Sequence, residues 1–201
     1  MLETLTLMLI GALTGILAGL LGVGGGLVVV PALAFWLPLR GIGPADALHA
    51  AVATSLASIC VTSVASAWAH YRRGAVDLRA LGWLTPGLLL GGSGGAIVVA
   101  GIPAPALTLF VAGFCLFAAW QVARPRAPQA HTAPRIPVRW LAPGGLAIGA
   151  VSAAVGIGGG SLTVPLLYRL GAPLQRAIAT SAAAGFPIAL AGTLGYMSAT
   201  T

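Results

Sequence analysis

The sequence contains very little charge and no lysine. Charged residues make up 6% of its 201 residues, whereas soluble domains typically carry about a quarter. All ten basic residues are arginine, and the only acids are Glu3, Asp46 and Asp77. Hydrophobic residues reach 58% and form stretches of about twenty residues, the length that crosses a bilayer. This composition excludes an ordinary soluble domain and predicts an integral membrane protein.

The side chains that most intramembrane chemistry needs are also scarce. Cys60 and Cys115 lie within apolar stretches, without the spacing of a metal site or a redox dithiol. No acidic residue lies inside an expected span to orient a catalytic base, so we expect no enzyme, no metal site and no cofactor. The arginines occupy short loops and form no basic patch with aromatic side chains, so nucleic acid is not expected as a partner.

The apolar stretches do not alternate as the strands of a membrane barrel do, so we expect an all-α multi-span bundle. Two long segments contain glycine clusters, and four further segments are expected to be uninterrupted spans. The interrupted segments are residues 5–38 and 141–170; the spans are residues 47–70, 78–100, 107–122 and 172–199. A Pro- and Arg-rich segment, residues 124–140, is expected to be a cytoplasmic linker between a first repeat, residues 1–123, and an incomplete second repeat, residues 141–201.

The two interrupted segments resemble each other closely. The stretch "GLLGVGGGLVVVPAL" (residues 19–33) is echoed by "AAVGIGGGSLTVPLL" (residues 153–167). Each is followed by a span that contains Ala-Thr-Ser, in "AVATSLAS" (residues 51–58) and in "AIATSAAA" (residues 177–184). Internal repeats with interrupted spans at matching positions are typical of secondary transporters.

The glycine clusters favour breaks in the helices. Each glycine in a helix costs about 1 kcal/mol relative to alanine, and Pro31 and Pro165 each remove a donor nearby. Gly24, Gly25 and Gly26 point in three directions on a helix, so they cannot share one packing face. We therefore expect unwound backbone with free N–H groups, which binds anions. A dinucleotide fingerprint is not expected, because no strand precedes the cluster and no acidic residue follows it.

Other glycines are spaced differently. Gly11, Gly15 and Gly19 recur every four residues, as do Gly87, Gly91 and Gly95. This spacing predicts faces of small residues on which helices pack closely. We expect Gly91, as a packing glycine, to tolerate a methyl group.

Two membrane topologies fit the repeats. If each interrupted segment is a re-entrant hairpin, the repeats are inverted and every arginine except Arg40 lies on one side of the membrane. If each segment crosses once, the repeats are parallel and Arg169 and Arg176 join Arg40. Because positive residues gather on the cytoplasmic side, the inverted arrangement in a bacterial inner membrane is favoured. The linker is cytoplasmic in both.

We expect the ligand to lie between the two breaks, which offer N–H and hydroxyl donors but no carboxylate, as a small oxyanion requires. The expected binding residues are Gly22, Gly24, Gly25, Gly26, Thr54, Ser55, Gly156, Gly158, Gly159, Gly160, Thr180 and Ser181. Hydrogen bonding between helices is the alternative for the stripe that Thr54 begins. His49 is a candidate for proton coupling, because imidazole exchanges protons near neutral pH; the alternative is a helix-end residue at the membrane interface.

The doubled glycine–proline motif, with its two Ala-Thr-Ser spans, resembles the sulfite exporter TauE/SafE family of membrane permeases. The resemblance implies a secondary transporter for a small anion such as sulfite or an organosulfonate. It also implies a protein that is embedded in the lipid bilayer and can form a homo-oligomer. It also implies two further spans after the second Ala-Thr-Ser span, so we expect this chain to be short at its C-terminus. An anion channel and an accessory or structural membrane subunit remain the alternatives.

Overall fold

The computed structural model describes residues 8–9, 11–16, 25–123 and 140–200, and this part of the chain contains helices and no strand. The expected all-α class is therefore confirmed for the described residues. Residues 8–9 and 11–16 are helical. They precede α2 (Gly26–Trp36), the short η1 (Pro38–Arg40), α3 (Pro44–Arg72), α4 (Leu78–Ala100), α5 (Ala104–Ala123), α6 (Leu141–Val155), α7 (Gly160–Arg169) and α8 (Leu174–Thr200).

Four of these helices are long and apolar enough to cross a membrane: residues Asp46–Arg72, Leu78–Ala100, Ala104–Gln121 and Leu174–Ala199. They coincide, within a few residues at each end, with the four spans that the sequence predicts. The predicted and observed spans match because a membrane-spanning helix must be about as long as the hydrocarbon core of the bilayer is thick. Helices α2, α6 and α7 are shorter and belong to the two segments with glycine clusters.

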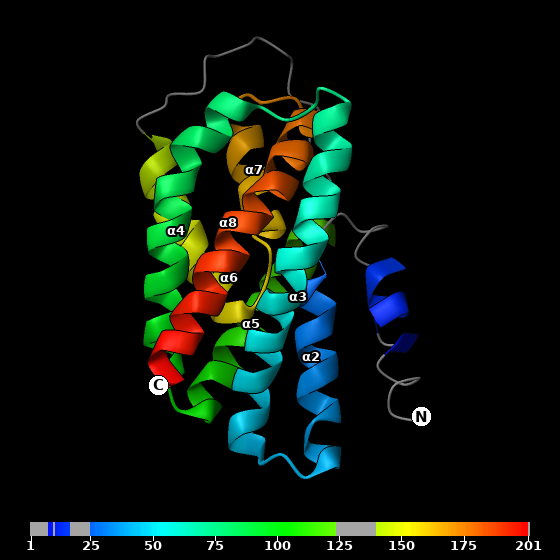
Figure 1. Ribbon diagram of the computed structural model, residues 1–201, viewed down its shortest axis with the longest axis vertical. Coiled ribbons are helices and arrows are strands. Elements are labelled where there is room, and N and C mark those ends of the chain that lie inside the picture. The colour runs from blue at the N-terminus through cyan, green and yellow to red at the C-terminus, as the bar shows by residue number, and fades with distance from the viewer. Residues whose placement is uncertain (1–7, 10, 17–24, 124–139, 201) are drawn as a thin grey trace.

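Two hydrogen-bond contacts fix the directions of the long helices (Figure 1). His49 Nε2 lies 3.3 Å from the carbonyl oxygen of Val99, so the start of α3 meets the end of α4. The N–H of Asp77 donates to Thr180 Oγ1 over 2.9 Å, so the start of α4 lies beside the first part of α8. Helix α3 therefore runs antiparallel to α4 and to α8.

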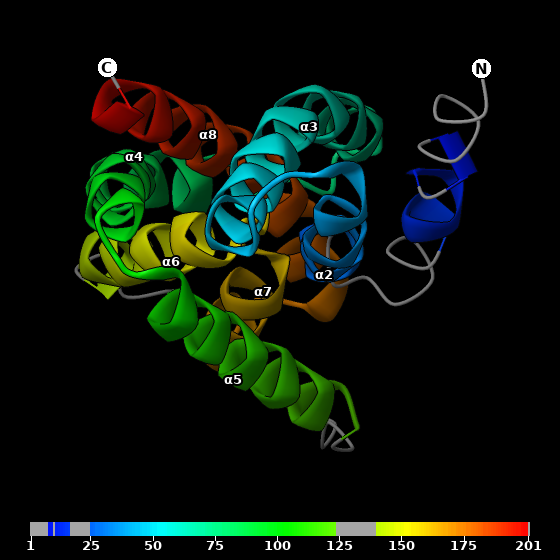
Figure 2. The ribbon, with the colours of Figure 1, turned by 90° about the horizontal axis from the view of Figure 1, so that it is seen from below.

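The shorter helices take opposite courses in the two halves of the chain. In Figure 1, α2 descends to the lower end, where η1 leads into α3. Helix α6 descends from the upper end, and after residues 156–159 helix α7 returns to that end, where α8 begins. Seen from below, α5 lies at the edge of the bundle (Figure 2).

Close packing of α4 against α6 confirms one of the two glycine faces. A Cβ at Gly87, Gly91 or Gly95 would overlap backbone atoms of α6. The absence of these side chains therefore lets the two backbones touch, as in other membrane helices. The expectation that Gly91 tolerates a methyl group is wrong, because that group would overlap the carbonyl oxygen of Leu146.

The other glycine face behaves differently. No described atom lies within 4 Å of a Cβ placed on Gly11 or Gly15, and both line a cavity. Helix packing at these two residues stays a prediction. Gly19 lies outside the described residues.

Candidate functional site

Residues 156–159 connect α6 to α7 through backbone that only glycine adopts readily. Gly156 and Gly159 both have φ of +73°, in the left-handed region. The N–H groups of Gly156 and Ile157 donate to the carbonyl oxygen of Ser152, which ends α6. The N–H groups of Gly158, Gly159 and Gly160 have no hydrogen-bond partner within the described residues. Helix α7 thus begins with open donors at the positive end of its dipole.

The start of α2 meets this connection directly. A Cβ on Gly26 would overlap the carbonyl oxygen of Gly156 and would stand 2.8 Å from the Cα of Ile157. Ser55, which is 1% exposed, donates from Oγ to the same carbonyl oxygen over 2.7 Å. The start of α2, the connection between α6 and α7, and the middle of α3 therefore come together at one point.

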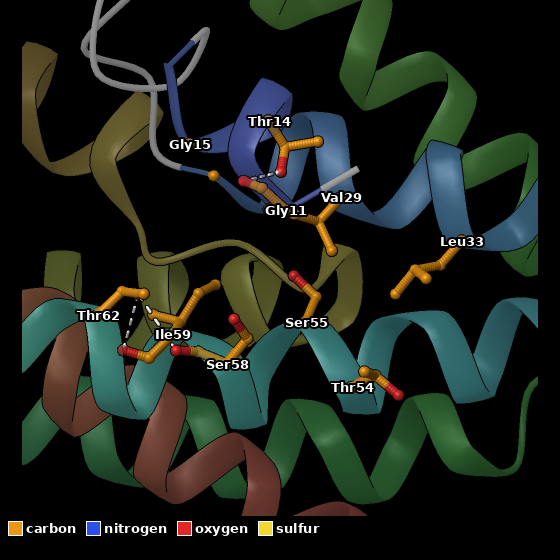
Figure 3. A pocket seen from close by; sticks show the side chains of 12 residues that line it. Gly11, Thr14, Gly15, Val29, Leu33, Thr54, Ser55, Ser58, Ile59 and Thr62 are labelled. Atoms are coloured by element: carbon orange, nitrogen blue, oxygen red, sulfur yellow. Dashed lines mark hydrogen bonds between the residues drawn. The ribbon is translucent and has the colours of Figure 1, made fainter. Parts of the chain in front are cut away.

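A cavity of about 250 Å³ lies beside this contact (Figure 3). Its lining consists of Gly11, Thr14, Gly15, Gly25, Gly26, Val29, Leu33, Thr54, Ser55, Ser58, Ile59 and Thr62. Several of its hydroxyls already donate to the backbone: Thr14 to the carbonyl of Gly11 over 3.0 Å, and Thr62 to that of Ser58 over 3.2 Å. Thr54 is exposed. Gly25 and Gly26, at the start of α2, thus face a small cavity whose bonded hydroxyls present lone pairs more than protons.

The residues of α8 that correspond to Thr54 and Ser55 have different surroundings. Thr180 is fully buried, and its Oγ1 accepts the N–H of Asp77 at the start of α4. Ser181 is 2% exposed, and its Oγ has no partner in the described part of the chain. The two Ala-Thr-Ser motifs are therefore alike in sequence and unlike in their contacts.

The remaining predicted residues are His49, Gly22 and Gly24. His49 is partly buried and contacts the end of α4, which fits the helix-end alternative. Its role in proton coupling stays a prediction. Gly22 and Gly24 lie outside the described residues.

Three hydroxyls near the second break were not singled out by the sequence reasoning. Ser152, Ser161 and Thr163 are buried, and their oxygen atoms lack hydrogen-bond partners among the described residues. They flank the glycines in "SAAVGIGGGSLT" (residues 152–163). The corresponding stretch of the first repeat is "AGLLGVGGGLVV" (residues 18–29), which is apolar at the same three places. This difference between the repeats is the signal that would have found them.

The two described carboxylates lie at helix starts. Asp46 lies in the first turn of α3, and Asp77 is the N-cap of α4, whose Oδ1 accepts the N–H of Ala80. The described residues contain no group of three His, Cys, Asp or Glu side chains that would hold a metal ion. What the described break offers is N–H and O–H donors.

Comparisons with known proteins agree with this architecture. Residues 7–201 match the family described as "Sulfite exporter TauE/SafE". A probable membrane transporter protein of Haemophilus influenzae is 32% identical over 196 residues, which cover 94% of this chain and 72% of that relative. The probable membrane transporter protein YdhB of Bacillus subtilis is 27% identical, over 96% of this chain and 78% of its own. A probable membrane transporter protein of Methanocaldococcus jannaschii is 30% identical, over 97% of this chain and 73% of its own length.

No solved structure matches the chain significantly. The family match nonetheless extends over almost the whole sequence, and it includes both glycine motifs and all four candidate spans. The chain therefore belongs to the sulfite exporter TauE/SafE family of membrane transporters, and it is a multi-pass protein of the inner (plasma) membrane.

Proposed function

We propose that the protein is a secondary transporter for a small oxyanion, such as sulfite or an organosulfonate, which binds at the two glycine breaks. The observation that carries this proposal is the start of α7, where the N–H groups of Gly158, Gly159 and Gly160 have no partner within the described residues. Backbone donors at a helix start bind anions without any charged side chain. Hydrogen bonds to an ionised acceptor are also about twice as strong as neutral ones.

The proposed binding site extends from the cavity of the first break to the second break. The first repeat contributes Gly22, Gly24, Gly25, Gly26, Thr54 and Ser55, and the second contributes Gly156, Gly158, Gly159, Gly160 and Ser181. The contact between Gly26 and the carbonyl of Gly156 supports one shared site. We also assign Thr180 a positioning role, because it lies against the start of α4, where its oxygen accepts the N–H of Asp77.

We further propose that the repeats, residues 1–123 and 141–201, are inverted and that their glycine-broken segments are re-entrant. Helix α2 leads to the lower end of the bundle and α7 to the upper end in Figure 1, and α3 and α8 run in opposite directions. Arginine positions support this arrangement. Arg72, Arg73 and Arg79 adjoin the turn between α3 and α4, Arg169 and Arg176 adjoin that between α7 and α8, and Arg40 lies in η1. The end with the arginine cluster is then cytoplasmic.

Flux measurements on the purified full chain in proteoliposomes test the proposed function. We expect sulfite flux that saturates with concentration, and no flux of choline or glycine. Gly159→Leu should abolish the sulfite flux, because a side chain would fill the break. Gly94→Leu is the matched control, since no described atom lies within 4 Å of its Cβ position, and it should transport normally.

The other outcomes would each reject the carrier. Flux that rises linearly with concentration would indicate a channel, and no flux above that of empty liposomes would indicate an accessory subunit. Equal transport by the Gly159→Leu variant and the parent would remove the second break from the site.

A further inference from the structure

The second break concentrates buried hydroxyls that have nothing to bond with. Ser152 on α6 and Thr163 on α7 are each 0% exposed, and Ser161 is 7% exposed. Their oxygen atoms have no hydrogen-bond partner within the described residues. A buried hydroxyl without a partner destabilises a folded protein, and such groups are rare in native structures. Three of them at one glycine break therefore call for a functional explanation.

Two of these hydroxyls point to the same place. The position that a Cβ of Gly159 would occupy lies 3.3 Å from Thr163 Oγ1 and 3.5 Å from Ser152 Oγ. Gly159 is the N-cap of α7, and Thr163 lies one turn further on, so its side chain leans back toward the start of the helix. The two hydroxyls thus stand beside Gly159, whose N–H, like those of its neighbours Gly158 and Gly160, has no partner within the described residues.

The first repeat has no hydroxyl at the three corresponding positions. Ala18, Leu27 and Val29 occupy the positions in the first repeat that correspond to Ser152, Ser161 and Thr163. In the adjoining cavity, the hydroxyls of Thr14, Ser55 and Thr62 already donate to backbone carbonyls. Ser152, Ser161 and Thr163 of the second break, by contrast, have no hydrogen-bond partner among the described residues.

We propose that Ser152, Thr163 and the N–H groups at the start of α7 form the subsite that binds the oxygen atoms of a small oxyanion. This subsite rests on the proposed transport function and adds two residues to its binding site. N–H groups can only donate, so the set selects an anion over a cation. Ile188 Cδ1 on α8 lies 2.5 Å from the same Cβ position, so this side chain must turn aside before a ligand reaches the hydroxyls.

Thermal unfolding of the purified full chain in detergent, followed by tryptophan fluorescence, tests the subsite. Sodium sulfite is titrated against sodium chloride at equal sodium concentration. The parent should show a rise in melting temperature that depends on sulfite. Thr163→Val and Ser152→Ala should each weaken the apparent sulfite affinity about tenfold or more, because each removes a hydrogen bond to a charged ligand.

The same variants should melt at an unchanged or higher temperature without sulfite, because each removes a buried hydroxyl that lacks a partner. Thr108→Val and Ser93→Ala are the matched controls. Their hydroxyls donate to carbonyls of their own helices, and they should keep the parent's sulfite affinity.

Four results would overturn the subsite. If both test variants kept the parent's sulfite affinity, the subsite would be rejected and the transport proposal would stand. A lower melting temperature of Thr163→Val and Ser152→Ala without sulfite would show that the hydroxyls serve the fold. Stabilisation by both sodium salts alike would show that the response is not specific for an oxyanion. A parent that responds to no anion would overturn the transport proposal together with the subsite.

Discussion

Ser55 Oγ donates a 2.7 Å hydrogen bond to the carbonyl oxygen of Gly156, which joins the middle of α3 to the break between α6 and α7. Gly26 lies against the same oxygen, because it has no side chain to keep α2 away. One carbonyl group thus connects three segments that are far apart in the sequence. If the connection between α6 and α7 moves relative to α3, this hydrogen bond must move with it or be lost.

Ser55→Ala should lower the free energy of unfolding by about 1–2 kcal/mol, because it leaves the buried carbonyl of Gly156 without its donor. Equilibrium unfolding of the purified protein in mixed micelles measures this change. Ser93→Ala is the control, since the Ser93 hydroxyl donates to the carbonyl of Leu89 in its own helix on a less buried face. We expect it to stay within about 0.5 kcal/mol of the parent. Equal losses in the two variants would show that the link between α3 and the break adds no stability.

Gly26→Ala should destabilise the protein by about 1–3 kcal/mol, because the new methyl group would overlap backbone that has no room to shift freely. Gly94→Ala makes the same chemical change in α4, where the Cβ position is open. It should stabilise the protein by up to about 1 kcal/mol through helix propensity. The same unfolding measurement compares them. If the Gly26 variant proved as stable as the Gly94 variant, α2 and the second break would not be in contact.

The sequence predicts the spans well because lipid leaves few choices. The span predicted at residues 78–100 is α4, Leu78–Ala100, and the interruption predicted within residues 141–170 lies at residues 156–159. Apolar length and consecutive glycines are local signals, so they need no knowledge of what packs nearby.

Contacts between distant segments explain what the sequence does not predict. A four-residue spacing identifies a face of small residues in both glycine-rich segments, yet among the described residues a helix lies against Gly87, Gly91 and Gly95 and none against Gly11 or Gly15. In the same way, the Ala-Thr-Ser repetition suggests equal roles for Thr54 and Thr180. Whether a hydroxyl binds a ligand or another helix depends on what lies opposite, which for Thr180 is Asp77.

Cysteine labelling from the two sides of the membrane tests the inverted repeats. In a background without Cys60 and Cys115, single cysteines replace Leu39 in η1, Gln175 at the start of α8, and Arg73 after α3; all three positions are exposed. We expect the Gln175 and Arg73 positions to react from the cytoplasmic side and the Leu39 position from the opposite side. Labelling of Leu39→Cys and Gln175→Cys from the same side would mean parallel repeats.

Thr180→Val distinguishes a positioning residue from a ligand. The Thr180 oxygen accepts the N–H of Asp77, whose own carboxylate caps α4 by accepting the N–H of Ala80. Valine keeps the shape of threonine but leaves that N–H without an acceptor, so we expect a loss of about 1 kcal/mol in unfolding free energy, restored by Thr180→Ser. Thr54→Val, at an exposed position, should change stability by less than about 0.5 kcal/mol. Sulfite titrations of the same variants complete the test. If Thr180→Val kept the parent's stability and lost sulfite binding, Thr180 would bind the ligand directly, as the repeated motif alone suggests.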